Sequence, residues 1–372
     1  MRHRCSFTTR TDYVGLIVSL YHKSWGKISS RRAGLRTRKP GGGAPRRPSE
    51  GGGQAGALGD HRRLPVPPID RKTGFVVWFL VKQHRIQRVV VLGYRGVAPA
   101  PEKEMTGMAS FLWLLAGTIC LRPYVFIFLG AYLLIAIWHL GAGRALAFLV
   151  LGYLISWMAE FASIHFGFPF GEYLYIPATL DREIWVAGVP FMDSLSYVFL
   201  AYASYSLALL ALTPGRWEDR WFSLQEEAAF KESWRPIILG AVLMVTLDIV
   251  IDPLALRGYR WFLGQIYGYP ESGVYFGIPL SNFGGWFLVG LGLIAVLQLI
   301  ITRAPASPWW DWGRRRLPFQ ALLGPALYLG ILGFNLVMTF LIGETCLGWV
   351  GIFIYLPFLS WLALKLASGS QQ

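Results

Sequence analysis

Long apolar stretches separated by short loops fill the chain from residue 109 onward. A helix needs about 20 apolar residues to cross the hydrocarbon core of a bilayer, and seven stretches reach or approach that length. A shorter stretch, 109–121, is ended by Arg122-Pro123 and is predicted to be a short first helix or a half-helix. We therefore expect an all-α, polytopic transmembrane helix bundle with about seven to eight spans. The predicted spans are 124–141, 145–165, 186–212, 236–256, 279–302, 318–341 and 346–366.

Residues 1–104 have a different composition, with 21 Lys and Arg against 6 Asp and Glu, whereas residues 105–372 have 14 against 15. This first segment is rich in Gly, Pro and Arg without periodicity, which predicts disorder. It is interpreted as a cytoplasmic basic tail, a nucleic-acid-binding arm, or translated upstream DNA from a misplaced start codon, with Met105 or Met108 as the natural start. We favour the last interpretation, so we expect no nucleic-acid partner and a multi-pass membrane domain over 105–372.

The distribution of basic residues predicts the orientation of the bundle. Alternate loops and the C-terminal end hold ten Lys and Arg, whereas the intervening loops hold only Arg182, Arg257 and Arg260. Because cytoplasmic loops carry an excess of positive charge, the ten-residue set is expected on the cytoplasmic side. Three isolated cysteines offer no disulfide framework and no zinc site.

Two aspartates interrupt the fourth predicted span, in "VTLDIVIDPLALRGYRW" (245–261). An ionised carboxylate in hydrocarbon is costly unless it is paired or faces a wet cavity. Residues four apart lie on one helix face, so Asp248 and Asp252 project the same way, one turn apart. Pro253 is expected to end or kink the helix and to free backbone carbonyl groups. Since two charged neighbours repel, one carboxyl is expected to keep its proton, as a general acid requires.

Other polar residues fall at the same predicted, non-cytoplasmic end of the bundle. Glu160 and Glu172 lie near the end of the second span and in the loop after it, whereas Asp193 and Asn282 open the third and fifth spans. Interfacial carboxylates, a helix cap and an aromatic belt at the headgroups are the alternative interpretations. The candidate catalytic residues are Asp248, Asp252, Glu160 and Glu172; the candidate substrate-binding residues are Tyr173, Tyr175, Asp193, Tyr259, Trp261, Asn282 and Trp286, and no metal ligands are predicted.

Four motifs give the chain a family resemblance that covers roughly residues 110–366. They are "FGFPFGEYLY" (166–175), "GVPFMD" (188–193), "LDIVIDPLALRGYRWF" (247–262) and "YFGIPLSNFGGW" (275–286). With these motifs the chain resembles the carotenoid-biosynthesis membrane proteins that include the CruF-type carotenoid 1,2-hydratases. The basic segment has no counterpart in that family, which supports the misplaced start.

The resemblance implies an all-helical multi-pass enzyme, a carotenoid hydratase of the hydro-lyase class. It would add water across the terminal 1,2 double bond of an acyclic carotenoid end group, as in lycopene or γ-carotene. No redox cofactor or metal is implied. The expected partners are a hydrophobic polyene substrate, the lipid bilayer and other carotenoid-pathway enzymes, and the expected location is the bacterial cytoplasmic membrane.

This chemistry agrees with the residues that the spans contain. Protonation of a trisubstituted alkene gives a tertiary carbocation that water captures, and buried carboxyl groups supply the proton and hold the water. Aromatic faces stabilise the cation.

Two other functions remain open. A non-enzymatic transporter or lipid-binding protein fits because intramembrane acids serve ion coupling. A Mg²⁺-dependent prenyltransferase-like enzyme fits the DxxxD spacing of Asp248 and Asp252, but a second such motif is missing and only Arg257 and Arg260 are near.

Overall fold

The computed structural model of the chain describes residues 107–218, 221–225 and 227–368. Seven helices in this part are long and apolar enough to cross a membrane, which confirms the predicted all-α, multi-pass class. The predicted basic segment 1–104 lies outside the described residues. The seven helices are α4 (Pro123–Leu140), α5 (Ala142–Phe166), α6 (Phe191–Leu212), α8 (Arg235–Leu256), α9 (Leu280–Arg303), α10 (Gln320–Leu341) and α11 (Thr345–Ser368).

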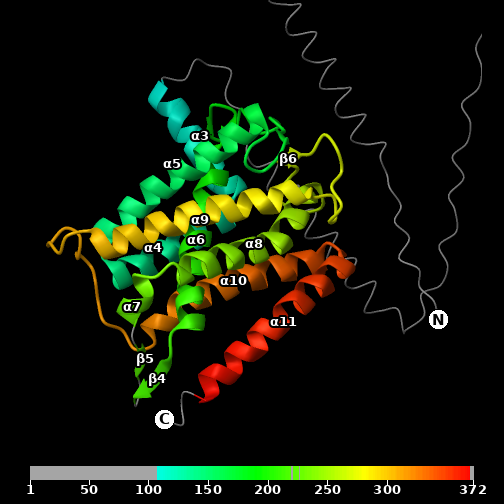
Figure 1. The fold of residues 1–372 in the computed structure, drawn as a ribbon. Coiled ribbons are helices and arrows are strands. Elements are labelled where there is room, and N and C mark those ends of the chain that lie inside the picture. The colour runs from blue at the N-terminus through cyan, green and yellow to red at the C-terminus, as the bar shows by residue number, and fades with distance from the viewer. Residues whose placement is uncertain (1–106, 219–220, 226, 369–372) are drawn as a thin grey trace, which may run out of the picture. The chain divides into compact units, whose positions relative to one another are not determined.

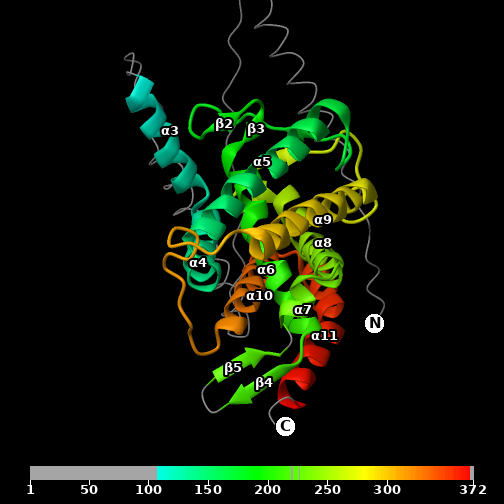
Figure 2. The ribbon, with the colours of Figure 1, turned by 60° about the vertical axis from the view of Figure 1, so that its left-hand side comes forward.

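Helix α6 is the centre of the bundle, and nearly all its residues are buried. It contacts α4, α5, α8, α9 and α10, whereas α8 and α9 pack along each other (Figures 1 and 2). Small residues permit these close approaches. A Cβ at Gly324 of α10 would lie 2.4 Å from the Ser206 side chain of α6, and one at Gly240 of α8 would lie 3.4 Å from the Cα of Tyr205.

The short apolar stretch before the first span forms a separate helix, α3 (Gly107–Leu121). Its 15 residues are fewer than the roughly 20 that a membrane crossing requires. Arg122 separates α3 from α4, and Pro123 occupies the first position of α4, where its missing N–H has no helical partner to lose. The expected seven or eight spans are therefore seven spans and one shorter helix.

The predicted start of the third span, at residue 186, is wrong because the first residues of that stretch form a hairpin. Strand β2 (Trp185–Val186) pairs with β3 (Val189–Pro190), and α6 begins only at Phe191. The turn between the strands places Ala187 and Gly188 at φ values of 50° and 86°. A helix cannot pass through two left-handed residues, so the apolar run is divided before Phe191.

Two loops at one end of the bundle cover the helices that carry the predicted acids. We call residues 167–190 the first roof loop and residues 257–279 the second roof loop. Strand β1 (Leu174–Tyr175) of the first pairs antiparallel with β6 (Tyr267–Gly268) of the second. A short 3₁₀ helix, η1 (Gly258–Arg260), begins the second roof loop.

The opposite end carries the loops with most of the basic residues. Between α6 and α8 lie a hairpin of β4 (Gly215–Glu218) and β5 (Trp221–Leu224), and the short helix α7 (Glu227–Lys231). The long loop between α9 and α10 is held by Arg144, which donates to Asp311 at 2.7 Å.

Pro253 was expected to end or kink the helix; it does not end it, because α8 continues for one further turn to Leu256, the predicted end of the span. Polar side chains bind the carbonyl groups of this last turn. Tyr267 donates to the carbonyl oxygen of Asp252 at 3.2 Å, and Arg257 donates to that of Pro253 at 2.8 Å. The last turn of α8 is thereby fixed to the second roof loop.

Gly285 and Gly284 of α9 give a matched test of how α9 packs under the first roof loop. A Cβ at Gly285 would lie 2.6 Å from the carbonyl oxygen of Pro169, whereas one at Gly284 would meet nothing within 4 Å. We expect Gly285→Ala to lower the free energy of unfolding by about 1–3 kcal/mol through overpacking. Gly284→Ala should leave it unchanged or higher. Thermal unfolding in detergent, followed by tryptophan fluorescence, measures both, and equal midpoints would contradict this packing.

Candidate active site

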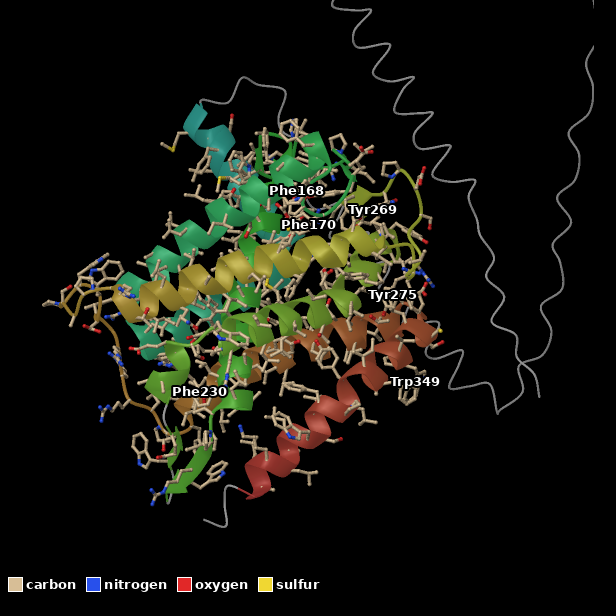
Figure 3. All side chains as sticks on the ribbon, viewed as in Figure 1. Phe168, Phe170, Phe230, Tyr269, Tyr275 and Trp349 are labelled. Atoms are coloured by element: carbon tan, nitrogen blue, oxygen red, sulfur yellow. The ribbon has the colours of Figure 1, made fainter. Side chains whose placement is uncertain are left out.

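A small cavity lies beneath the two roof loops, among the ends of α5, α6, α8 and α9. Its volume is about 40 Å³, which is room for about three water molecules. Figure 3 shows Phe170 and Tyr269, which both line it, at the end of the bundle away from Phe230. The lining residues are Glu160, Phe170, Tyr173, Tyr175, Asp193, Tyr197, Asp252, Tyr267, Tyr269, Asn282 and Trp286.

One wall of the cavity comes from α5 and α6 and carries Glu160 and Asp193. The Glu160 side chain is 1% exposed and accepts a hydrogen bond from the hydroxyl of Ser194. The hydroxyl groups of Tyr175 and Tyr197 also lie close to the Glu160 carboxyl group. Tyr175 donates to Asp193 Oδ2 at 2.7 Å. Hydroxyl donors thus surround both carboxyl groups of this wall.

The facing wall comes from α8 and α9 and carries Asp248, Asp252 and Asn282. Asn282 Nδ2 donates to Oδ2 of Asp252 at 2.5 Å and to Oδ2 of Asp248 at 3.1 Å. The two carboxyl groups lie within hydrogen-bonding reach of each other. Among the described residues Asp248 Oδ1 has no N–H or O–H partner. Because ionised carboxylates have no donor of their own, this contact requires a proton on one of the two.

Only Asp252 of this pair lines the cavity. Asp248 lies one turn deeper in α8 and is 1% exposed, against 8% for Asp252. The pair therefore has one member at the cavity surface and one behind it. The amide of Asn282 donates to both carboxyl groups and so fixes Asp252 at the cavity surface and Asp248 behind it.

Aromatic rings form most of the remaining lining. Tyr197 and Trp286 stack with ring centroids 4.3 Å apart and planes 4° apart, and Phe170 lies 6.0 Å from each. Tyr173 contacts Tyr267 and Tyr269 edge-on. A cavity with such walls offers π-faces to a cation and apolar surface to a hydrocarbon.

The tyrosines of the roof loops stay protonated. Burial raises the pKa of Tyr175 and Tyr267 well above the ordinary value of 10, and the neighbouring carboxyl groups raise it further. The same causes raise the pKa of Tyr173. Each hydroxyl is therefore a permanent hydrogen-bond donor, and Tyr173 donates to Tyr175 at 3.5 Å. The resulting chain of donors runs from Tyr173 through Tyr175 to Asp193.

Three residues named as candidates from the sequence lie away from the cavity lining. Glu172 and Tyr259 are exposed, the latter by 67%. Trp261 packs against Tyr124 and donates to the carbonyl oxygen of Leu254 at 3.3 Å. The structure brings the other eight candidates together, seven in the lining and Asp248 directly behind it.

Several lining residues were not named from the sequence: Phe170, Tyr197, Tyr267 and Tyr269. Tyr197 follows Asp193 by four residues and so lies on the same face of α6. This spacing could have identified Tyr197 as a lining residue from the sequence. Tyr267 and Tyr269 carry no such signal, because only the pairing of β1 with β6 places them beside Tyr173 and Tyr175.

The two arginines nearest the Asp248–Asp252 pair in sequence bind elsewhere. Arg257 and Arg260 both form ion pairs with Glu344, Arg257 at 3.1 Å. Within the described residues no group of three or more His, Cys, Asp or Glu side chains is arranged to hold a metal ion. The acid pair is instead bridged by the Asn282 amide.

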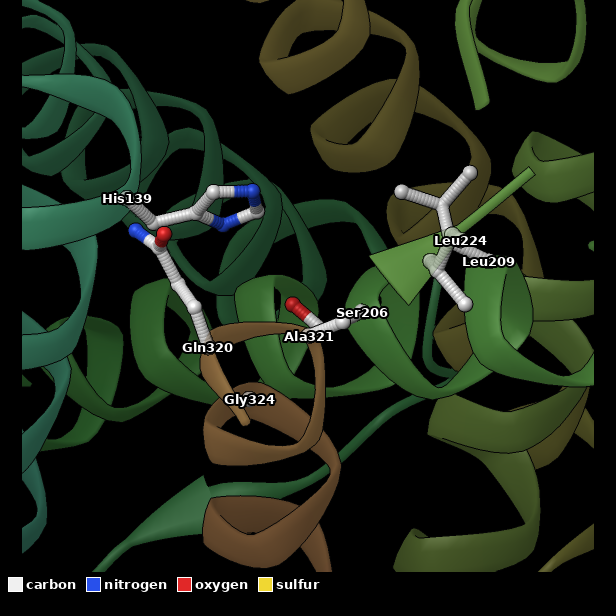
Figure 4. A pocket seen from close by; sticks show the side chains of 7 residues that line it. All are labelled: His139, Ser206, Leu209, Leu224, Gln320, Ala321 and Gly324. Atoms are coloured by element: carbon white, nitrogen blue, oxygen red, sulfur yellow. The ribbon is translucent and has the colours of Figure 1, made fainter. Parts of the chain in front are cut away.

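A second, smaller cavity lies at the opposite end of the bundle. It is lined by His139, Ser206, Leu209, Leu224, Gln320, Ala321 and Gly324 (Figure 4). Its volume of about 10 Å³ is at the lower limit for one water molecule. It has no carboxyl group in its lining. We therefore place the candidate active site at the roof-loop end.

Seven helices long and apolar enough to cross a membrane define a multi-pass membrane protein, and this one has an acidic and aromatic cavity at one end of the bundle. The sequence model of a protein family described as carotenoid biosynthesis protein matches residues 112–357. This match covers more than half of the chain and all the lining residues. The chain belongs to the carotenoid biosynthesis protein family.

One curated relative is the bisanhydrobacterioruberin hydratase of Haloarcula japonica, which is 28% identical over 206 residues. The match covers 54% of this chain and 62% of the relative, so the chain spans less than two thirds of that protein's length. No solved structure matches the chain.

Asn282 and Asn335 provide a matched test of the bridge between the two aspartates. Asn282→Leu removes the amide that donates to both carboxyl groups, so we expect a loss of about 2–4 kcal/mol in the free energy of unfolding. Asn335 is also buried but donates only to Ile331 of its own helix. Asn335→Leu should therefore cost less than half as much. Thermal unfolding of the two purified variants checks this, and equal losses would argue against the bridge.

Proposed function

We propose that the protein is a carotenoid hydratase that adds water to the terminal 1,2 double bond of an acyclic carotenoid end, as in lycopene or γ-carotene. The observation that carries this proposal is the pair of facing acidic walls in one aromatic cavity. Membership of a carotenoid biosynthesis family and the name of the relative, a hydratase, support it.

Hydration of this alkene needs one proton donor and one proton acceptor on opposite sides of the double bond. The acid transfers a proton to C2, the π bond breaks, and a tertiary carbocation forms at C1. A water molecule then forms the C1–O bond and gives a proton to the base. The product is a tertiary alcohol, and the two proton transfers balance, so neither oxidant nor reductant is consumed.

In the proposed mechanism Asp252 is the acid. It lines the cavity, and its contact with Asp248 already requires a proton within the pair. Asp248 is too deep to meet the substrate and serves as the proton reservoir behind Asp252. The Asn282 amide keeps the two carboxyl groups in place.

Asp193 and Glu160, on the facing wall, position the water and accept its proton. Asp193 accepts a hydrogen bond from Tyr175, as an ionised carboxylate does. The rings of Tyr197, Trp286 and Phe170 line the same cavity and stabilise the carbocation at C1 in this mechanism.

The cavity volume also bears on how the substrate binds. About 40 Å³ accommodates a few water molecules but not the five-carbon end of an isoprenoid chain. In this proposal the residues that line the cavity therefore rearrange when the end group enters. The remainder of the polyene lies in the bilayer, which we propose is the bacterial cytoplasmic membrane, where other carotenoid-pathway enzymes are the proposed suppliers of the substrate.

The experiment that tests the function is expression of the full chain in lycopene-producing bacterial cells, followed by pigment extraction and mass spectrometry. We expect carotenoids that have gained the mass of one or two water molecules. Substitution of H₂¹⁸O in the medium should add the heavy oxygen to the new hydroxyl group. Unchanged pigments in cells whose membranes contain the protein would exclude this function for the acyclic substrates tested.

Removal of the proposed proton donor should abolish activity without loss of the protein from the membrane. General acid catalysis contributes about 100- to 10,000-fold, so we expect Asp252→Asn and Asp248→Asn each to lower the hydration rate at least 100-fold. Glu172→Gln is the control because Glu172 is exposed outside the cavity. Conversion at the wild-type rate by Asp252→Asn would remove Asp252 from the mechanism.

Two tyrosines allow a test of the hydroxyl donor to Asp193. Tyr175→Phe removes only the oxygen that donates to Asp193, and we expect a rate decrease of about tenfold or more, in line with the loss of one hydrogen bond to a charged group. Tyr275 is another roof-loop tyrosine, but its hydroxyl is buried without a hydrogen-bond partner among the described residues. Tyr275→Phe should keep the wild-type rate, and equal effects of the two substitutions would contradict the role of Tyr175.

A further inference from the structure

Arg122 lies at the break between α3 and α4 and forms hydrogen bonds with both roof loops. We propose that Arg122 is a positioning residue for hydration: its guanidinium group holds the two roof loops in the register that places Asp193 and the tyrosines around the substrate. This inference rests on the proposed function, and it also predicts a structural effect that is measured without activity.

Arg122 is a buried residue that links the two roof loops by hydrogen bonds, and we call this link the clasp. The residue is 2% exposed. One terminal nitrogen donates to the carbonyl oxygen of Leu263 in the second roof loop at 2.7 Å. The other donates to Glu183 in the first roof loop at 3.3 Å, and the Glu183 side chain is 0% exposed. One planar cation thus binds both loops at once.

The contact with Glu183 leads directly to the start of α6. The hydroxyl of Thr179 donates to the Glu183 carboxylate, and the backbone N–H of Ile184 donates to Thr118 Oγ1 at 2.8 Å. The carbonyl oxygen of Ile184 in turn accepts from the N–H of Phe191 at 2.9 Å. Phe191 is the first residue of α6 and precedes Asp193 by two positions, so the location of Glu183 determines where that acid lies.

The contact with Leu263 leads to the paired strands of the roof. Three residues further on, the carbonyl oxygen of Ile266 accepts from the N–H of Ile176 at 2.7 Å. This bond adjoins the β1–β6 pair, in which Tyr175 lies opposite Tyr267. The Leu263 contact therefore supports the strands that carry the cavity tyrosines.

Helix α3 also contacts the first roof loop, through Gly117 and Thr118. A Cβ at Gly117 would lie 1.8 Å from the carbonyl oxygen of Arg182, so only glycine permits this contact. The side chain of Thr118 lies one residue further along the same helix. Arg122 and the end of α3 therefore contact residues 182–184 together.

Lysine cannot replace Arg122 in this role. A guanidinium group presents its donors in a fixed planar fork that spans two acceptors, whereas an ammonium group is a point charge on a flexible stem. Arg122→Lys keeps the positive charge beside Glu183 but loses the fixed link to Leu263. The substitution therefore separates the positioning role from the role of charge.

Arg144 supplies the matched control at the opposite end of the bundle. It is also buried, at 8% exposure, and donates to a carboxylate, Asp311, and to backbone carbonyl groups, including that of Leu140 at 3.0 Å. Its described hydrogen bonds go to Leu140 and to the loop between α9 and α10, at residues 304–311, and not to the roof loops. Arg144→Lys therefore reports what the loss of a buried guanidinium does to stability alone.

The test compares the two lysine variants of the full chain in membranes. We expect Arg122→Lys to lower the hydration rate per folded protein about 10- to 100-fold, as small misplacements of reacting groups do. Arg144→Lys should stay within twofold of wild type. An unchanged rate for Arg122→Lys, or an equal loss in both variants, would overturn the positioning role.

Hydrogen–deuterium exchange in detergent gives the readout that does not depend on activity. We expect Arg122→Lys to accelerate exchange of the amides of Ile176, Ile184 and Phe191 at least tenfold, and Arg144→Lys to leave these amides protected. If the wild-type protein has no hydratase activity, the proposed function fails, and the exchange result still decides whether Arg122 holds the roof. Unchanged exchange at all three amides would exclude the clasp.

Discussion

Every polar group within a membrane-spanning bundle needs a partner, because hydrocarbon offers none. Four carboxyl groups at the ends of α5, α6 and α8 impose this demand on one end of the molecule. Their partners come from other elements: Ser194 for Glu160, Tyr175 for Asp193, and Asn282 for the two aspartates of α8. The hydrogen bonds of these acids therefore connect α5 with α6, α8 with α9, and the first roof loop with α6.

The same partners make the two walls chemically different. On α8 two acids share one amide and contact each other, an arrangement that keeps a proton. On α5 and α6 each acid instead accepts a hydrogen bond from a hydroxyl group, Glu160 from Ser194 and Asp193 from Tyr175. In the proposed hydration one wall donates a proton and the other accepts one, and aromatic rings complete the lining of the same cavity.

The length of the apolar runs predicted most of the fold, since hydropathy over about 20 residues is a local property. Six of the seven spans begin and end within three residues of the predicted bounds. The exception is the start of α6, where the turn at Ala187 and Gly188 interrupts an apolar run that hydropathy cannot divide. Pro253 does not end α8, and two side chains of the second roof loop, Arg257 and Tyr267, bind carbonyl groups at this end of the helix.

By itself the sequence determined the long apolar spans, seven or eight in number, the end at which the acids fall, and the pairing of Asp248 with Asp252 on one face. These follow from helix length and helical periodicity alone. Only the tertiary structure decided which residues share the cavity: it excludes Glu172 and Trp261 and brings in Tyr197 and Tyr267. The physical reason is that the roof loops are placed by contacts between residues far apart in the chain, the β1–β6 pairing and the two bonds of Arg122, which no local pattern encodes.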